Sequence, residues 1–160
     1  MLYILEKGYC KEILIKTINF TKKSAQKFHF NYHKKPVSSY HEPLEYLYEP
    51  NAAVLKSGAF HEISTQLNIF KLHQHSHLYT SKKRIEFPGR EFKIIAVLPY
   101  DKKQILKLVP NKKANITIRN FHKTVAQIRK ELKIKDGGDI FLFFTTNIHN
   151  KFICMYCKKL

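Results

Sequence analysis

The sequence is poor in the residues that mark several classes of protein. Its 160 residues include five Gly, six Pro and no Trp, too few for a fibrous or a disordered chain. The three Cys, at positions 10, 154 and 157, suit a reducing compartment where thiols stay free. No apolar run approaches the ~20 residues of a membrane-spanning helix, and the first residues lack the pattern of a signal peptide. These absences predict a globular cytoplasmic protein.

Negative charge is also scarce. The chain has 29 Lys and Arg against 12 Asp and Glu, which gives a net charge of +17 and a pI near 9.8. Such an excess attracts polyanions, although a source organism rich in lysine would also produce it. Residues 81–135 contain sixteen basic against four acidic side chains, an excess of +12. This concentration favours a basic face in the C-terminal half.

Apolar residues are plentiful enough for a packed core, at 44% of the chain with 13% aromatic. Short alternating runs predict strands, or a strand–helix unit, at residues 2–5, 12–18 and 27–32. Residues 33–43 have no periodicity and predict a linker. Asn51 is a candidate N-cap for a helix that the apolar spacing extends to Leu67.

The C-terminal half has the clearer pattern. Strands are predicted at residues 91–98, 114–119, 139–146 and 151–157, the last two joined by a turn at 147–150. One helix is predicted from Asp101 to Pro110. A second begins with a capping box of Thr124 and Gln127 and ends at Gly137-Gly138. The order β-α-β-α-β-β predicts an α+β fold with helices on one face of a sheet.

Four separated blocks carry a family resemblance: YLYEPNAAVLKSGAF at 46–60, KLHQHSHLYTS at 71–81, FPGREFKI at 87–94, and ANITIRNFHKTVAQIRKELKIKDGGDIFLFFTT at 114–146. Together they resemble the C-terminal part of bacterial class I S-adenosylmethionine-dependent methyltransferases that carry a THUMP-like domain. The segment LYILEKGYCKEIL at 2–14 is similar to the ferredoxin-like unit of that family.

The resemblance implies a ferredoxin-like unit at residues 1–45, a helical connecting segment at 46–86 and a THUMP-like domain at 87–160. It also implies a Rossmann-type catalytic domain that binds S-adenosylmethionine. That domain is expected upstream of Met1, so the chain would be an expressed fragment, a truncated product or half of a split enzyme, without activity alone. No glycine-rich turn that opens a helix and no N/D-P-P-Y/F-like motif occurs in the sequence.

THUMP domains deliver RNA to modification enzymes, so the resemblance implies RNA as a partner. It also implies a methyltransferase domain as a partner, in cis or in trans. No membrane partner is expected. The candidate RNA-binding residues are chosen from the basic C-terminal half because of this expected partner. They are Arg90, Lys102, Lys103, Lys107, Lys112, Lys113, Arg119, Asn120, Lys123, Arg129 and Lys130. Arginine presents a fork of donors that fits phosphate. For Arg119, an internal salt bridge or a stabilised turn is the alternative.

The remaining Cys, His and Glu candidates predict no catalytic or metal site. Cys154 and Cys157 are three apart in a strand and would point to opposite faces. His73, His75 and His77 alternate, and would share a face only in an extended segment. Glu49 could cap a helix or a neighbouring domain, and has no evident catalytic partner.

Two other functions remain open. The chain could be a protein-docking or structural module, which an exposed apolar patch of Tyr48, Phe60, Tyr79 and Phe87 would favour. It could also be the folded but idle remnant of a decayed gene.

Overall fold

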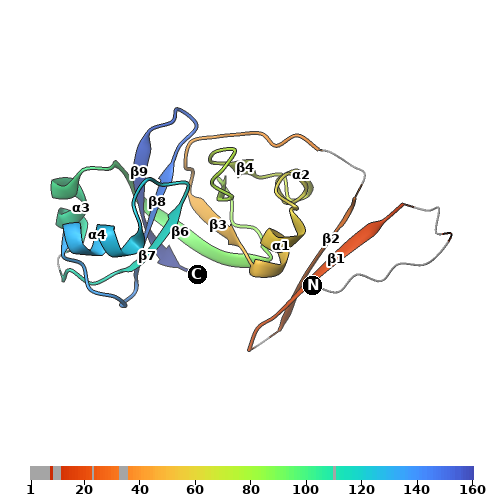
Figure 1. Cartoon of the computed structure of the whole chain (residues 1–160), viewed down its shortest axis with the longest axis horizontal. Helices are drawn as coiled ribbons and strands as arrows, with labels where there is room; N and C mark the ends of the chain where they lie inside the picture. The colour runs from red at the N-terminus through yellow and green to blue at the C-terminus, as the bar shows by residue number, and fades with distance from the viewer. Residues whose placement is uncertain (1–7, 9–11, 23, 33–35, 110) are drawn as a thin grey trace.

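A computed structural model describes residues 8, 12–22, 24–32, 36–109 and 111–160 (Figure 1). Nine strands and four helices lie within these ranges. They are β1 (Leu14–Phe20), β2 (Ala25–Asn31), β3 (Tyr46–Pro50), α1 (Ala52–Ser57), α2 (Glu62–Gln66), β4 (Phe70–Lys71), β5 (Tyr79–Ser81), β6 (Gly89–Pro99), α3 (Lys102–Leu108), β7 (Asn115–Arg119), α4 (Val125–Leu132), β8 (Ile140–Thr146) and β9 (Phe152–Lys159).

The centre of the molecule is a seven-stranded sheet in the order β4-β5-β3-β6-β9-β8-β7. The pair β7 and β8 is parallel, and the other neighbours are antiparallel. β6 is the longest strand and joins the two halves of the sheet by pairing with β3 on one side and β9 on the other. The fold is therefore α+β, as the sequence predicts.

The two faces of this sheet bury different cores. Helices α3 and α4 cover one face at the β7–β8–β9 end, where Ile128, Leu132 and Phe144 are fully buried (Figure 1). Side chains alternate along a strand, so the neighbouring residue Phe143 lies on the other face. There it joins Leu47, Leu72, Leu78 and Phe92, with the segment between β4 and β5 packed over them. This second surface is called the open face below.

The large sheet is strongly curled. In a flat sheet β3 and β7 would be four strand spacings apart, roughly 19 Å. Yet Glu49 on β3 forms an ion pair with Arg119 on β7, and His73 beyond β4 bonds Asn120 just after β7. The accumulated twist of the strands therefore makes the open face concave and brings the two ends of the sheet together.

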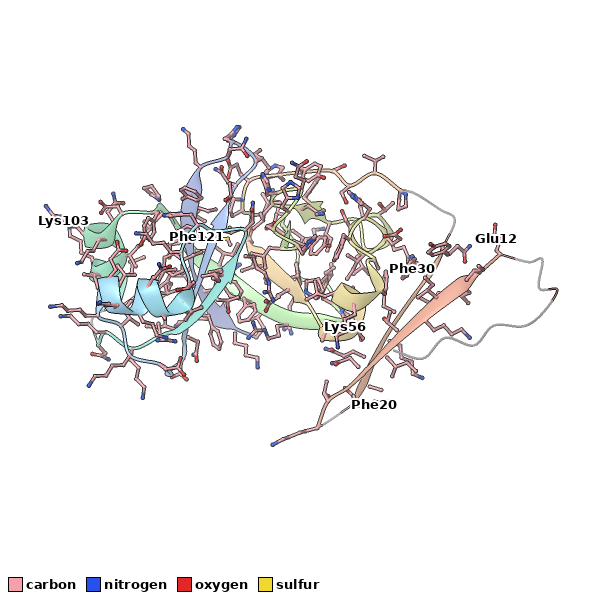
Figure 2. All side chains as sticks on the ribbon, viewed as in Figure 1. Glu12, Phe20, Phe30, Lys56, Lys103 and Phe121 are labelled. Carbon is pink, nitrogen blue, oxygen red and sulfur yellow. The ribbon has the colours of Figure 1, made fainter. Side chains whose placement is uncertain are left out.

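β1 and β2 form a separate antiparallel hairpin beside helix α1 (Figure 1). Phe28 and Phe30 on its inner face are buried against a core that includes Tyr48 and Ile63. The outer face remains in solvent, and Phe20 lies at the end of β1 (Figure 2). No helix in the described ranges is long and apolar enough to cross a membrane.

Local sequence signals located several elements correctly. Asn51, Asp101 and Thr124 each accept a backbone N–H bond at a helix start, and the capping box of Thr124 and Gln127 is present. The predicted final hairpin is also confirmed, since β8 and β9 pair through the turn at 147–150. The predicted strand at 2–5 and Pro110 lie outside the described residues.

Four structural details correct the predictions. The single helix expected after Asn51 is two helices, because Gly58 ends α1 in the left-handed region at φ 76°. The α4 helix ends at Leu132, with Lys133 as a left-handed cap, well before Gly137-Gly138. Strand β3 and the short pair β4–β5 were not predicted.

Candidate nucleic-acid interface

Two arginines converge on one buried carboxylate on the open face. Glu49 is 3% exposed and accepts from both Arg90 and Arg119. The Arg90 Nε lies 2.7 Å from Glu49 Oε2, and the Arg90 Nη2 also donates to that oxygen. The Arg119 Nη2 lies 2.6 Å from Glu49 Oε1. One carboxylate thus holds two guanidinium groups and leaves the cluster with a net positive charge.

Strand register explains why these three side chains meet. Glu49 and Arg90 are direct cross-strand partners between β3 and β6, so their side chains share a face. On β7, Ile116 and Ile118 pack toward the helices, which turns Arg119 to the open face. The curl of the sheet then brings Arg119 across to Glu49. The arginine side chains remain 44% and 38% exposed, so both stay accessible to an anionic ligand.

A buried lysine and a half-buried histidine lie near this cluster. Lys71 is fully buried, and its Nζ donates to the Gln74 carbonyl at 3.1 Å. Burial lowers the pKa of Lys71. His77 stacks on the Phe60 ring, with centroids 3.8 Å apart. Burial lowers the pKa of His77 to about 4, and the charges of Lys71 and Arg119 act in the same direction.

Most of the predicted lysine contacts lie elsewhere in the structure. Lys102, Lys103 and Lys107 are exposed on α3, and Lys130 is exposed on α4. Figure 2 shows Lys103 at the end of the molecule opposite the β1–β2 hairpin. Lys112 and Lys113 are exposed in the turn between α3 and β7. These six lysines belong to the helical layer and not to the open face that presents Arg90 and Arg119.

Two further candidates are engaged in internal contacts. Lys123 donates to Glu131 at 2.6 Å and to the Tyr100 hydroxyl at 3.2 Å. Arg129 forms an ion pair with Asp136 and donates to the carbonyls of Ala114 and Ile134. Both therefore tie α4 to neighbouring segments. The eleven candidates divide into a loosely held lysine surface, two structural cations and the open-face group of Arg90, Arg119 and Asn120.

A cavity of about 620 Å³, widely open to solvent, lies at the carboxyl ends of β7 and β8 and is lined from Asn120 onward, the residue after Arg119. The residues that line it are His73, Gln74, His75, Asn120, Phe121, His122, Thr146, Asn150 and Phe152. His73 is the buried centre of a hydrogen-bond network with Asn120 and Asn150. The cavity thus combines aromatic rings with polar groups.

The cysteines and histidines considered as metal ligands do not form a metal site among the described residues. Cys154 and Cys157 are buried in different cores on opposite faces of the sheet, and burial raises the pKa of both thiols. His77 has a positive φ, so the three alternating histidines do not share an extended face. Among the described residues no group of His, Cys, Asp and Glu is placed to hold a metal ion.

The described residues also do not fit S-adenosylmethionine in the way a Rossmann domain does. Such a domain holds the cofactor at a glycine-rich turn that leads from a strand into a helix. Gly137 and Gly138 instead follow a helix, and both lie against the Lys113 side chain.

Several residues of this site were not predicted from the sequence. Glu49 was expected in a capping role without its arginine partners, and Asn150, Phe121 and Phe152 were not predicted as site residues. Positive φ angles at Asn120 and Asn150 are common for Asn at strand ends, and local sequence could have suggested them. The convergence of these residues could not be read locally, because Glu49 and Arg119 are 70 positions apart.

Comparisons with known proteins assign both halves of the large sheet. Residues 46–88 match a ferredoxin-like domain model, and residues 89–159 match a THUMP domain-like model. The chain therefore contains a ferredoxin-like and a THUMP-like domain. Their boundary falls where β6 begins, so the β3–β6 pairing and the Glu49–Arg90 ion pair both join the two domains. The sequence-based division placed the ferredoxin-like unit at residues 1–45 instead.

One solved structure is similar over most of the chain. It is described as a "putative methyltransferase from Porphyromonas gingivalis W83". The two proteins share 33% sequence identity with a TM-score of 0.82, and the match covers 91% of this chain. The same match covers 38% of the Porphyromonas chain, which is therefore much longer than the part matched here. The search of curated proteins gave no match.

Proposed function

We propose that this chain binds RNA and positions it for a S-adenosylmethionine-dependent methyltransferase domain, present in the same polypeptide or as a separate one. The observation that carries the proposal is the arginine pair held on Glu49 at the junction of the ferredoxin-like and THUMP-like domains. Guanidinium groups bind phosphate through paired donors, and here a buried carboxylate fixes their positions in advance. The +17 net charge adds a general attraction for polyanions.

The longer Porphyromonas structure supports the second half of this proposal. A match over 38% of that chain leaves room for a further domain, and its description names a methyltransferase. In this proposal the present chain supplies affinity for substrate and the other domain supplies the cofactor and the chemistry. The cytoplasm, where RNA and free thiols are found together, is the compartment that fits this role.

Titration of labelled RNA into the chain over a salt series tests the RNA half. We expect affinity to fall steeply with salt, because each neutralised phosphate releases counterions. Arg119→Ala should weaken binding roughly 10- to 100-fold, since a charge-assisted contact contributes roughly 1.5–3 kcal/mol. Lys56→Ala, on the exposed surface of α1, is the matched loss of one positive charge and should have little effect. Failure to bind RNA at low salt would contradict the proposal.

A protein-docking function is a second candidate, although the predicted patch does not support it. Tyr48, Tyr79 and Phe87 are buried in the core. The outer face of the hairpin supports it instead, because Ile18 and Phe20 are exposed there, Phe20 at 82%. An exposed apolar strand face commonly marks an interaction site.

We propose that this hairpin face packs against the methyltransferase domain, as one part of a longer assembly. The test is to titrate the chain with the separately expressed remainder of the Porphyromonas protein, outside the matched region. Binding should be lost in the Ile18→Ser/Phe20→Ser variant. It should be kept in the control variant Lys16→Ser/Lys27→Ser, which changes the same outer face and leaves its apolar side chains in place. Binding that is equal in both variants would reject the hairpin as the docking surface.

A further inference from the structure

The cavity beside Arg119 has the position and size of a small ligand site. It lies at the carboxyl ends of β7 and β8, which form the parallel pair of the large sheet. Ligands of sheets with parallel strands bind at this edge, because the loops that follow neighbouring strands meet there. The volume of about 620 Å³ lies within the range of roughly 300–1,000 Å³ typical of small-molecule pockets.

The polar wall of the cavity is fixed before any ligand arrives. His73 Nδ1 accepts from the His75 backbone N–H at 3.1 Å and lies 3.0 Å from Asn120 Nδ2. These two donors place the imidazole proton on Nε2, which donates to Asn150 Oδ1 at 3.1 Å. The Thr146 hydroxyl also holds the Asn120 carbonyl at 2.6 Å. One buried histidine thus orients both asparagine amides.

This orientation leaves a complementary pair of groups for a ligand. Asn120 uses its amino group on His73, so its Oδ1 acceptor is not used in the described network. Asn150 uses its oxygen, so its Nδ2 donor is not used there either. Both residues line the same cavity. A nucleobase edge offers donors and acceptors side by side, and amide side chains match such edges well.

The aromatic wall supplies a surface for stacking. Phe152 is 41% exposed, with the His122 ring 4.2 Å and the Phe121 ring 5.1 Å from its own. Figure 2 shows Phe121 close to the strands of the THUMP-like domain. Exposed rings beside polar groups are the usual platform for unpaired bases, which stack without regard to sequence. None of the residues that line the cavity is Asp or Glu.

We propose that this cavity binds an unpaired nucleobase of single-stranded RNA, stacked on the Phe152 side and hydrogen-bonded by Asn120 and Asn150, while Arg119 contacts the adjoining phosphate. The inference rests on the proposed RNA-binding function and adds where, and in which form, the RNA is recognised. A base inserted here spans the two domains, because His73 belongs to the ferredoxin-like domain and the two asparagines to the THUMP-like domain.

The test compares two oligonucleotides of equal charge on the whole chain. One is a single-stranded RNA octamer with 2-aminopurine at a central position, and the other is an abasic octamer with the same ribose–phosphate backbone. We expect the base-bearing RNA to bind about tenfold more tightly, the scale of one stacked base. We also expect the 2-aminopurine fluorescence to fall on binding, as it does when that base stacks.

Glycine variants remove the amides without straining the fold. Asn120 and Asn150 have φ of 49° and 57°, a region that glycine adopts freely. Asn120→Gly and Asn150→Gly should reduce the preference for bases and keep the affinity for the abasic octamer. Asn68→Gly, at φ 51° and outside the cavity, is the matched control and should behave as the native chain. Phe152→Ala should remove both the preference and the fluorescence change.

The outcomes separate the two proposals. If the native chain binds both octamers equally, or if the preference persists in both asparagine variants, the nucleobase cavity is rejected while RNA binding stands. If neither octamer binds at low salt, the proposed function fails and the cavity proposal fails with it. If Phe152→Ala does not fold, the asparagine variants and their control still decide the question.

Discussion

The two faces of the large sheet hold their positive charge in different ways. On the helical face, Lys102, Lys103 and Lys130 stand on solvent-exposed turns of α3 and α4. On the open face, Arg90 and Arg119 are tied to a carboxylate that is itself buried. Mobile surface lysines attract any polyanion, whereas positioned guanidinium groups can select a geometry. The difference shows that a basic composition and a basic site are separate properties of this chain.

Among substitutions that distinguish the two faces, Glu49→Gln should cause the largest loss of stability. The substitution removes the only carboxylate that Arg90 and Arg119 contact among the described residues. We expect the free energy of unfolding to fall by about 2–4 kcal/mol, near the lower part of the range for a broken buried pair, because the arginines can still reach water. Urea denaturation at pH 7 measures it.

The matched change on the helical face is Lys102→Gln/Lys103→Gln. These side chains are exposed, so the free energy of unfolding should stay within about 0.5 kcal/mol of the native value. Equal losses in the two variants would mean that Glu49 does not organise the open face.

Exchanges between arginine and lysine, which conserve the charge, compare how the two faces contribute to RNA affinity. Arg119→Lys keeps the charge and loses the planar fork, so RNA affinity should fall about fivefold to tenfold. Lys112→Arg/Lys113→Arg makes the reverse exchange in the turn before β7 and should leave affinity within about twofold. Fluorescence anisotropy with one RNA at fixed salt measures both. If the two exchanges have the same effect, net charge alone accounts for binding.

The pH dependence of stability tests His77, the half-buried histidine near Lys71 and Arg119. His77 has a pKa of about 4 in the folded protein, below its ordinary value of 6.5. Between these values the unfolded chain binds the proton and the folded chain does not, so stability decreases as pH falls from 6.5 toward 4. We expect His77 to account for about 1 kcal/mol of this decrease, allowing for its partial exposure.

His77→Asn removes that titration, and asparagine tolerates the φ of 50° at this position. Thermal denaturation at several pH values should show a flatter profile for the variant between pH 4 and 6.5. The His149→Asn variant, at an exposed site near Glu42, is the control. An unchanged slope in His77→Asn would place the pH dependence in other groups.

The smallest effect should come from the helical face. Thr124→Ala removes the hydroxyl that caps α4 and accepts from the Gln127 N–H at 3.2 Å. We expect a loss of about 0.5–1 kcal/mol in the free energy of unfolding, with RNA affinity unchanged because α4 lies on the other face from Arg119. A loss of RNA affinity in a folded Thr124→Ala variant would show that the helical face contributes to the site.

Much of the fold could be predicted from local patterns. The caps at Asp101 and Thr124, the β-branched residues of β7 and the apolar run of β8 are patterns of residues close together in sequence. Strand β3 was missed because its last residues, Glu49-Pro50, precede an N-cap and read locally as the start of a helix. Only its pairing with β5 and β6 makes it a strand. The position of the α4 end was missed because Lys133 adopts a conformation more typical of glycine.

The sequence by itself determined the α+β class, the excess of positive charge and the starts of α1, α3 and α4, because these follow from composition and from contacts within a few residues. Its candidate site was a collection of basic residues with no arrangement. Only the tertiary structure decided that Arg90 and Arg119 share Glu49, and that His73 orients Asn120 and Asn150. The physical reason is the curl of the seven-stranded sheet. This curl is the sum of the twists between many neighbouring strands, so no single segment of the sequence encodes it.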